Sequence, residues 1–452
     1  MTTVPMSHEL ARRAAQAVLD YPGADGVEVL VTASTDALTR YANSEIIQNT
    51  VRNDVRATVR VLAGDRSAAS ATTQLDEASL LEAAARALEA AKASIPDEDA
   101  VGLPSPDEVG RAEPVDRWDD ATAAATPADR AKAVNEILAV AADGSAAGIY
   151  QTGAHFYGIF NSAGIDCFDA YTRTNTTCLI DVGDSTGWGE ASSFAIDRVD
   201  VAAAAKCARD KADAGRGATD AEPGTYEVVL EGPATAALVE YLAYMGFGAK
   251  SMIEGESFFS SRKGGEVAAP SITIADDVFH PESVGIGFDF EGVPKQRVAV
   301  IEAGKAITPV TDRRSAKKLG TTSTGHNSGS NEFGPYGFNI VLEAGDSSLE
   351  ELISEVDDGF LVTRFHYVNI LDRPATELTG MTRDGTFRIR NGEIAGAVHN
   401  FRFAQSALDA LASVTGVGRD LNAIAPDYTS FGSTVAPALR IGKFRFSSVT
   451  SH

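Results

Sequence analysis

Cysteine is scarce in this chain of 452 residues. The three cysteines, Cys167, Cys178 and Cys207, are an odd number and form no Cys-x-x-Cys pair. Disulfide frameworks and thiolate zinc knuckles both depend on paired cysteines. The sequence therefore disfavours both kinds of site, and we expect three ordinary thiols that are buried or half-buried.

Long apolar runs are absent. No segment approaches the roughly 18 consecutive apolar residues that predict a membrane span. Residues 1–7 also lack a basic stretch followed by an apolar run, which a secretory leader would show. We therefore expect a cytoplasmic location and no membrane partner.

Basic residues are in the minority, because 39 Lys and Arg stand against 63 Asp and Glu and give a formal net charge of −24. A surface of that average sign repels phosphate backbones and anionic lipid headgroups. We therefore expect no nucleic-acid partner. The length, with 44% hydrophobic residues, is nevertheless sufficient for the cores of two or three domains.

Histidine is too sparse for a local metal site, because no two of the seven histidines lie within ten residues of each other. This spacing excludes a pair of zinc-binding histidines on one helix but leaves open a site assembled from distant residues. The histidines are His8, His155, His280, His326, His366, His399 and His452.

Phosphate-binding and calcium-binding loops are also missing. No Gly-x-x-x-x-Gly-Lys-Ser/Thr occurs, and the glycines at 285 and 287 lack the third glycine and the strand-to-helix setting of a dinucleotide fingerprint. The acidic runs at 97–99 and 119–120 lack the ligand spacing of a calcium loop. We interpret these runs as solvated connectors.

The first half of the chain shows helical and strand patterns in turn. Two-residue alternation predicts four antiparallel strands within 26–62, a hairpin turn at Gly64 and Asp65, and a further meander within 147–194. Helical spacing predicts helices over 8–20, 78–93, 127–142 and 201–214, with an exposed connector over 95–122. The order of helix, strands and helix occurs twice, which suggests a duplicated α+β unit.

A polar run at 215–224 is typical of a flexible domain boundary. We predict an N-terminal α+β domain, residues 1–220, and a C-terminal β-rich domain, residues 221–452. The fold class is α+β, with N-terminal helices packed on antiparallel sheet and a mostly antiparallel C-terminal domain around one central helix. Glycine-rich polar loops at 285–292 and 320–330 either bind a ligand or are mobile.

The second half of the chain carries a resemblance to a known family. Its features are a strand from Tyr226, a Gly-Pro turn, a helix that ends near Glu254, and the segments 349–363, 385–394 and 417–421. Together they resemble the TldD/PmbA family of metallopeptidases. The resemblance covers essentially the whole chain and implies the same α+β fold.

The resemblance implies two branches that differ at this helix. The TldD branch binds zinc through a His-Glu-x-x-x-His motif, whereas the TldE (PmbA) branch lacks the motif. Here Val239 and Tyr244 occupy the histidine positions and Glu240 remains. Since valine and tyrosine do not replace the imidazole lone pairs, this chain resembles the TldE branch, and we expect no catalytic residue, bound metal or other cofactor on it.

The resemblance also implies a two-component peptidase in which a TldD-like partner brings the zinc. This chain would then line a chamber for short or unfolded peptides. The residues expected to contact the peptide are Glu240, Tyr241, Tyr244, His326 and Asn327. Most of these residues also have a simpler interpretation. Glu240 could be a polar helix or interface residue, and the two tyrosines could pack in the core. His326 could be a solvated loop residue.

Two other functions remain open. The chain could be a stand-alone peptide-binding or scaffold protein. It could also be a metal-independent peptidase that pairs His326 with Glu240, Ser323 or Ser328, although no Gly-x-Ser-x-Gly elbow surrounds these serines. A homodimer in the absence of the partner is likewise open.

Overall fold

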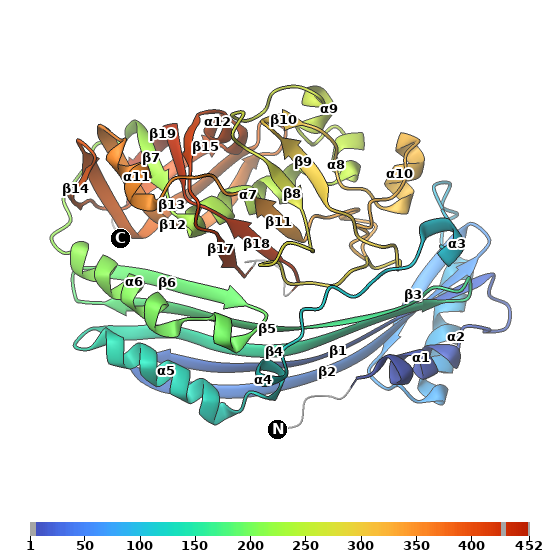
Figure 1. The fold of residues 1–452 in the computed structure, drawn as a ribbon. Coiled ribbons are helices and arrows are strands. Elements are labelled where there is room, and N and C mark those ends of the chain that lie inside the picture. The colour runs from blue at the N-terminus through green and yellow to red at the C-terminus, as the bar shows by residue number, and fades with distance from the viewer. Residues whose placement is uncertain (1–5, 426–430, 451–452) are drawn as a thin grey trace.

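The computed structural model describes residues 6–425 and 431–450. Segment 1–5 and His452, which were considered above, lie outside these ranges. Figure 1 shows two layers: a long curved sheet built from the first half of the chain, and above it a more compact half built from the second. The predicted α+β fold class is confirmed.

Six strands of the described chain form the N-terminal sheet in the order β3-β2-β1-β4-β5-β6, and every neighbouring pair is antiparallel. The order is that of two three-stranded meanders joined between β1 and β4, which fits the suggested duplication. The strands are β1 (Gly26–Ala42), β2 (Glu45–Ala63), β3 (Arg66–Thr72), β4 (Ser145–Asn161), β5 (Asp166–Asp181) and β6 (Thr186–Ser193).

The prediction of four strands within 26–62 is wrong, because β1 and β2 are two long strands joined by one tight turn. Asn43 and Ser44 form that turn with φ of 50° and 59°, the left-handed pair that a two-residue hairpin requires. The apolar–polar alternation weakens in the middle of β1, but β1 is hydrogen-bonded to β2 on one side and to β4 on the other and so stays extended. The predicted turn at Gly64 and Asp65 is confirmed.

Helices cover the outer face of this sheet (Figure 1). Their starts follow the sequence: the Thr126 side chain and Asp129 form a reciprocal capping box, and Asp200 caps the next long helix through the Ala203 N–H. The helices on this face are α1 (His8–Gln16), α2 (Glu77–Ala93), α4 (Asp120–Ala124), α5 (Pro127–Ala141) and α6 (Val201–Ala214), with a 3₁₀ turn at Ile196–Arg198. The short α3 (Pro106–Val109) lies on the side of the C-terminal half (Figure 1), where Val109 packs in the cluster between the two halves.

The C-terminal half packs two sheets around α7 (Gly232–Gly246), which contacts strands of both. One sheet has the order β10-β9-β8-β11-β18-β17 and the other β12-β7-β19-β15-β13-β14, with β16 beside β19. Most pairs are antiparallel, but β11 with β18 and β7 with β12 are parallel. The predicted central helix is thus confirmed.

The strands of this half are β7 (Gly224–Leu230), β8 (Ile274–Asp276), β9 (Val298–Glu302), β10 (Lys305–Ala306), β11 (Asn339–Leu342), β12 (Asp358–Asp372), β13 (Glu377–Arg390), β14 (Glu393–Ala397), β15 (Phe401–Ser406), β16 (Val414–Val417), β17 (Asn422–Ile424), β18 (Ser433–Ala436) and β19 (Leu439–Val449). Its smaller helices are α8 (Ala249–Ile253), α9 (Phe259–Arg262), α10 (Arg313–Leu319), α11 (Leu349–Ser354) and α12 (Ala407–Ala412).

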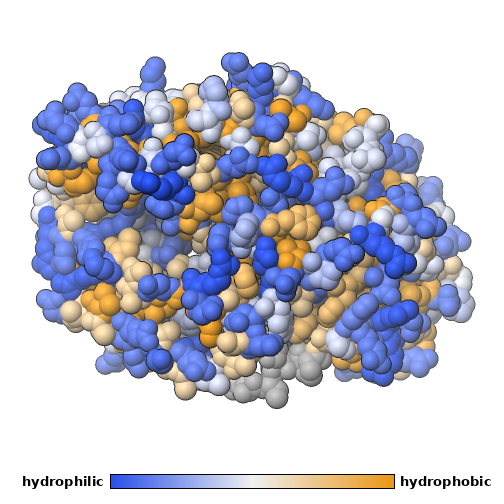
Figure 2. Space-filling view, in the orientation of Figure 1, coloured by the Kyte–Doolittle hydropathy of each residue, from blue (hydrophilic) through white to orange (hydrophobic). Residues whose placement is uncertain are grey.

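The two halves share a hydrophobic cluster. Side chains from β4 and β5, among them Ile159 and Tyr171, pack against Ile286, Phe288 and Phe431 of the second half. The linker predicted to be flexible is also held in place, because the Thr219 N–H donates to the Ala397 carbonyl oxygen at 3.1 Å. On the face shown in Figure 2, hydrophilic residues dominate, and the surface is hollowed where the two halves meet at the left.

Two expectations about polar residues need correction. The acidic run 97–99 is not simply solvated, because Asp97 and Asp99 pair with Arg314, and Asp99 also pairs with Lys318. Cys207 is exposed, whereas Cys167 and Cys178 are buried as expected. Among the described helices, none has the length and apolar character needed to cross a membrane.

Candidate functional site

Helix α7 forms the floor of the site. It begins with Gly232 and Pro233, where proline fits because the first helical N–H groups have no intrahelical acceptor. Most of its residues are buried and apolar on all sides, as expected for a helix between two sheets. Glu240, Tyr241 and Tyr244 share the one face that borders open space.

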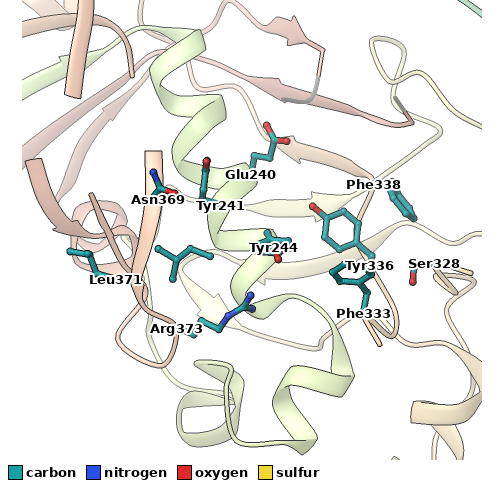
Figure 3. A pocket seen from close by; sticks show the side chains of 11 residues that line it. Glu240, Tyr241, Tyr244, Ser328, Phe333, Tyr336, Phe338, Asn369, Leu371 and Arg373 are labelled. Atoms are coloured by element: carbon teal, nitrogen blue, oxygen red, sulfur yellow. The ribbon is translucent and has the colours of Figure 1, made fainter. Parts of the chain in front are cut away.

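That open space is a cavity of about 770 Å³. Three segments far apart in the sequence surround it: α7, the last residues of β12 with the turn that follows, and the loop 328–338. Figure 3 shows these side chains converging from the two sides of the helix. The lining residues are Glu240, Tyr241, Tyr244, Ser328, Phe333, Tyr336, Phe338, Asn369, Ile370, Leu371 and Arg373.

Aromatic rings make up one wall of the cavity. The Tyr244 and Tyr336 rings meet edge to face with centroids 6.3 Å apart, and Tyr336 contacts Phe338 at 4.8 Å. Phe333, with 60% of its surface exposed, stands at the opening. The wall therefore offers apolar surface that a bound molecule or a partner chain could cover.

Opposite charges lie at the two ends of the helix face. The Arg373 guanidinium carbon lies 4.9 Å from the centre of the Tyr244 ring, a cation–π contact. Glu240 is buried one helical turn away, near Tyr336 (Figure 3). Burial, and then the negative charge of Glu240, raise the pKa of the Tyr336 phenol, so this hydroxyl stays protonated at neutral pH.

Tyr241 anchors the helix to the opposite wall. Its hydroxyl donates a hydrogen bond to the carbonyl oxygen of Val368, which lies at an irregularity in β12. Next to it, the Asn369 amide donates to the Tyr367 carbonyl oxygen at 3.1 Å. The Tyr241 bond ties β12 to α7 and so helps to set the width of the cavity, whereas the Asn369 bond lies within β12.

Val239 and Tyr244, the two positions compared with zinc ligands, point to different environments. Val239 is fully buried in the large C-terminal core, whereas Tyr244 lies on the cavity wall. Neither offers an imidazole, and the side chain at 239 does not reach the cavity. These residues do not fit a zinc ion. Within the described ranges, no three His, Cys, Asp or Glu side chains group as a metal site.

His326 is not part of this cavity. It is fully buried, so the expectation of a solvated loop histidine is wrong. Its Nε2 lies 2.9 Å from an Asp276 carboxylate oxygen, and its Nδ1 lies 2.9 Å from the Thr324 hydroxyl. Because both ring nitrogens are engaged, His326 has no exposed atom to act on a ligand, and the structure does not bring it to Glu240.

Asn327 lies on the far side of the same loop. Its backbone N–H donates to Asp289 and its side-chain oxygen accepts from the Gly329 N–H. It borders a separate cavity of about 60 Å³ together with Arg60 and Glu291. Only Glu240, Tyr241 and Tyr244 of the predicted peptide contacts therefore share one cavity, and peptide binding by all five residues stays a prediction.

Sequence reasoning missed a buried cluster of charged residues beside this loop. Asp276, Asp289, Glu291 and Lys295 are all buried, and the Lys295 ammonium donates to the Asn339 side chain at 3.2 Å. Burial opposes the Asp276 charge, but nearby His326 and Lys295 outweigh it and lower the pKa of Asp276. The close spacing of Asp289, Glu291 and Lys295 in the sequence was the available signal, and nothing local linked Asp276 to them.

The lining residues Asn369 and Arg373 were missed as well. They lie more than 120 positions after α7 and follow an ordinary strand pattern, so no local motif marks them. Phe333 and Tyr336 lie just beyond the glycine-rich loop at 320–330 that was predicted to bind a ligand or to be mobile, so that prediction did not include them.

Two parts of the chain match domains of a known family. Residues 223–448 match the PmbA/TldA metallopeptidase C-terminal domain, and residues 27–91 match the PmbA/TldA metallopeptidase domain 1.

A metalloprotease of Methanothermobacter thermautotrophicus is 26% identical over 252 residues, 53% of this chain and 53% of that protein. The metalloprotease PmbA of Escherichia coli O157:H7 is 28% identical over 156 residues, 34% of this chain and 32% of that protein. The chain spans about half the length, or less, of these relatives.

The fold is similar to a solved structure over nearly its whole length. TldE from Thermococcus kodakarensis superposes with a TM-score of 0.85 at 21% identity, covering 97% of this chain and 99% of that one. At this identity the likeness shows the fold alone.

Proposed function

Because the chain belongs to the PmbA/TldA metallopeptidase family, we propose that it is the zinc-free, peptide-binding subunit of a two-component metallopeptidase. The observation that carries the proposal is the cavity on α7. It lies at the helix where the zinc-bearing branch has its motif, and here aromatic and charged side chains line it instead of histidines.

The chemistry of the cavity argues against a metal ion on this chain. Val239 has no donor atom and faces the core. The guanidinium of Arg373 lies over the ring of Tyr244, the other motif position. A fixed positive charge there repels a divalent cation, so we assign the zinc to a TldD-like partner chain.

The same chemistry suits a short peptide. A volume of about 770 Å³ falls within the usual range for small-ligand sites. Aromatic walls accept apolar side chains, while Asn369 and Ser328 offer hydrogen-bonding groups for a peptide backbone. Tyr244, Phe333 and Leu371 remain partly open at the mouth, where substrate or the partner chain would cover them.

In this arrangement the partner supplies the zinc and the group that activates water. This chain binds the peptide and orients it toward the partner, and Glu240 acts as a binding group. A cytoplasmic location is part of the proposal, since the three cysteines form no disulfide among the described residues.

Co-purification tests the proposal directly. This chain, tagged, is expressed with the zinc-motif paralogue from the same organism, and the complex is assayed for zinc per subunit and for cleavage of unfolded peptides. We expect peptide cleavage only by the complex, zinc only on the partner, and loss of activity with a chelator. Tyr244→Ala in this chain should raise KM while zinc content stays unchanged.

Other results would select the alternatives. Chelator-insensitive cleavage by the isolated chain would identify a metal-independent peptidase. Peptide binding without any association with the paralogue would favour a stand-alone binding protein. Stoichiometric zinc on the isolated chain would contradict the proposal.

A further inference from the structure

Arg373 stands out among the cavity residues because its guanidinium lies over an aromatic ring but has no anionic partner among the described residues. Within residues 6–425 and 431–450 its side chain makes one polar or charged interaction, the cation–π contact with Tyr244. The carboxylate of the adjacent Asp372 accepts the Ala375 N–H at 2.8 Å in the turn, and it forms no ion pair with Arg373 in the described part of the chain. By comparison, Arg364 and Arg388 on the neighbouring strands each pair with an aspartate.

The geometry suits capture of a carboxylate. A guanidinium presents five N–H donors in a planar fork that matches two carboxylate oxygens. The Tyr244 ring packs against one face of the Arg373 guanidinium, while the edge of the guanidinium that carries the N–H groups stays available on the cavity wall (Figure 3). Phe333, Tyr336 and Leu371 line the same cavity, and a peptide that covers their apolar surface would displace water and so strengthen a charge-assisted hydrogen bond to Arg373.

Glu240 gives the cavity a direction. It lies one turn before Tyr244 on α7, a rise of about 6 Å along the helix axis. An anionic group is repelled from Glu240 and attracted to Arg373, whereas an ammonium or backbone N–H group is attracted to Glu240.

We propose that Arg373 binds the C-terminal carboxylate of a short peptide whose last side chain is aromatic or aliphatic. The proposal rests on the peptide-binding function above and deepens it, because it makes the cavity a subsite for free peptide ends. The last side chain packs against Phe333 and Tyr336, and the chain runs from Arg373 toward Glu240.

Binding of three tripeptides to the full chain, measured by calorimetry, tests this assignment. The peptides are Ala-Ala-Phe with a free carboxylate, Ala-Ala-Phe amide, and Ala-Glu-Phe amide, which moves the carboxylate to a side chain. For the natural chain we expect the free acid to bind at least about 10-fold more tightly than either amide. Arg373→Gln should abolish this preference, and Arg373→Lys should keep only part of it, because lysine lacks the planar fork.

Arg402→Gln is the matched control, because it removes one positive charge from an exposed position on β15 outside the cavity. It should leave the preference for the acid intact. Thermal unfolding of each variant checks that the fold is retained.

Several results would overturn the proposal: equal binding of acid and amide, an acid preference that survives Arg373→Gln, or no binding of the acid at about 10 mM. Tight binding of Ala-Glu-Phe amide would assign Arg373 to side-chain carboxylates and remove the C-terminal assignment. The two proposals fail separately. If the natural chain prefers the free acid through Arg373 but the complex cleaves no peptide, only the peptidase function is refuted. If the complex cleaves the acid and the amide equally well, only the carboxylate subsite at Arg373 is refuted.

Discussion

The carboxyl of Glu291 shows how strongly the assembled fold changes the chemistry of one residue. The side chain is buried between the halves, and its Oε2 atom has no hydrogen-bond partner in the described part of the chain. Burial, followed by the charges of Asp289 and Glu28, raises the pKa of Glu291 to about 8. Arg60 and Arg313 also face it and offset only part of this effect.

A raised carboxyl pKa makes stability depend on pH with a definite sign. Between pH 4.5 and about 8 the folded chain keeps the Glu291 proton while the unfolded chain has released it. The folded state therefore binds more protons than the unfolded state in this interval. The stability that comes from the bound Glu291 proton is fully present below the interval and is lost as pH rises through it. Glu291→Gln, which mimics the protonated form, should remove the loss.

We predict that Glu291→Gln has little effect on the free energy of unfolding near pH 4.5 and stabilises the chain above pH 8 by on the order of a few kcal/mol. Urea unfolding across this pH range measures the effect. The exposed Glu302→Gln is the control and should show no such trend. A pH-independent difference between Glu291→Gln and the natural chain would refute the prediction.

At the scale of elements, the break after α7 determines the shape of the cavity. Close approach of neighbouring groups explains the glycines at 246 and 248. A methyl group on Gly246 would lie 2.8 Å from the buried Phe258 ring, and one on Gly248 would collide with the Pro335 carbonyl oxygen. Pro335 belongs to the loop that supplies the aromatic wall.

We predict that Gly248→Ala destabilises the chain by about 1–3 kcal/mol, because the loop must move to admit the methyl group. The shift displaces Tyr336, so peptide affinity should fall as well. Gly442→Ala is the control, since its methyl group would lie no closer than 3.3 Å to Ser413. Urea unfolding together with peptide titration provides both readouts, and unchanged values for Gly248→Ala would contradict this account.

At the scale of the whole molecule, the two halves are joined by more than the linker. They share a hydrophobic cluster, and Arg117 of the connector donates to the Ser283 and His280 carbonyl oxygens at 2.9 and 3.0 Å. The acidic run 97–99 binds α10 through Arg314 and Lys318. These contacts hold the sheet against the half that carries the cavity.

We predict that Arg314→Gln makes the connector at 94–105 more sensitive to limited proteolysis, while global stability changes by less than about 1 kcal/mol because the ion pairs are near the surface. High salt should produce the same sensitivity in the natural chain through screening. Arg86→Gln, which removes an ion pair within α2, is the control and should leave the connector protected. Equal cleavage rates for Arg314→Gln and the natural chain would show that the Arg314 ion pairs do not hold the connector in place.

The sequence by itself determined the features that depend on local interactions. Helix starts at Thr126 and Asp200, the turn at Gly64 and the α+β fold class follow from capping, turn chemistry and periodicity. Glu240, Tyr241 and Tyr244 also share a helix face by spacing alone. The resemblance to the metallopeptidase family is confirmed, whereas the boundary between residues 220 and 221 stays a prediction.

Only the tertiary structure decided which distant residues complete the cavity and which do not. It placed Arg373 over Tyr244, buried His326 against Asp276 and attached Asp97 to Arg314. None of these pairs is close in sequence, so each depends on how the sheets pack around α7. Periodicity shows which face of an element is buried, but packing alone determines what that face meets.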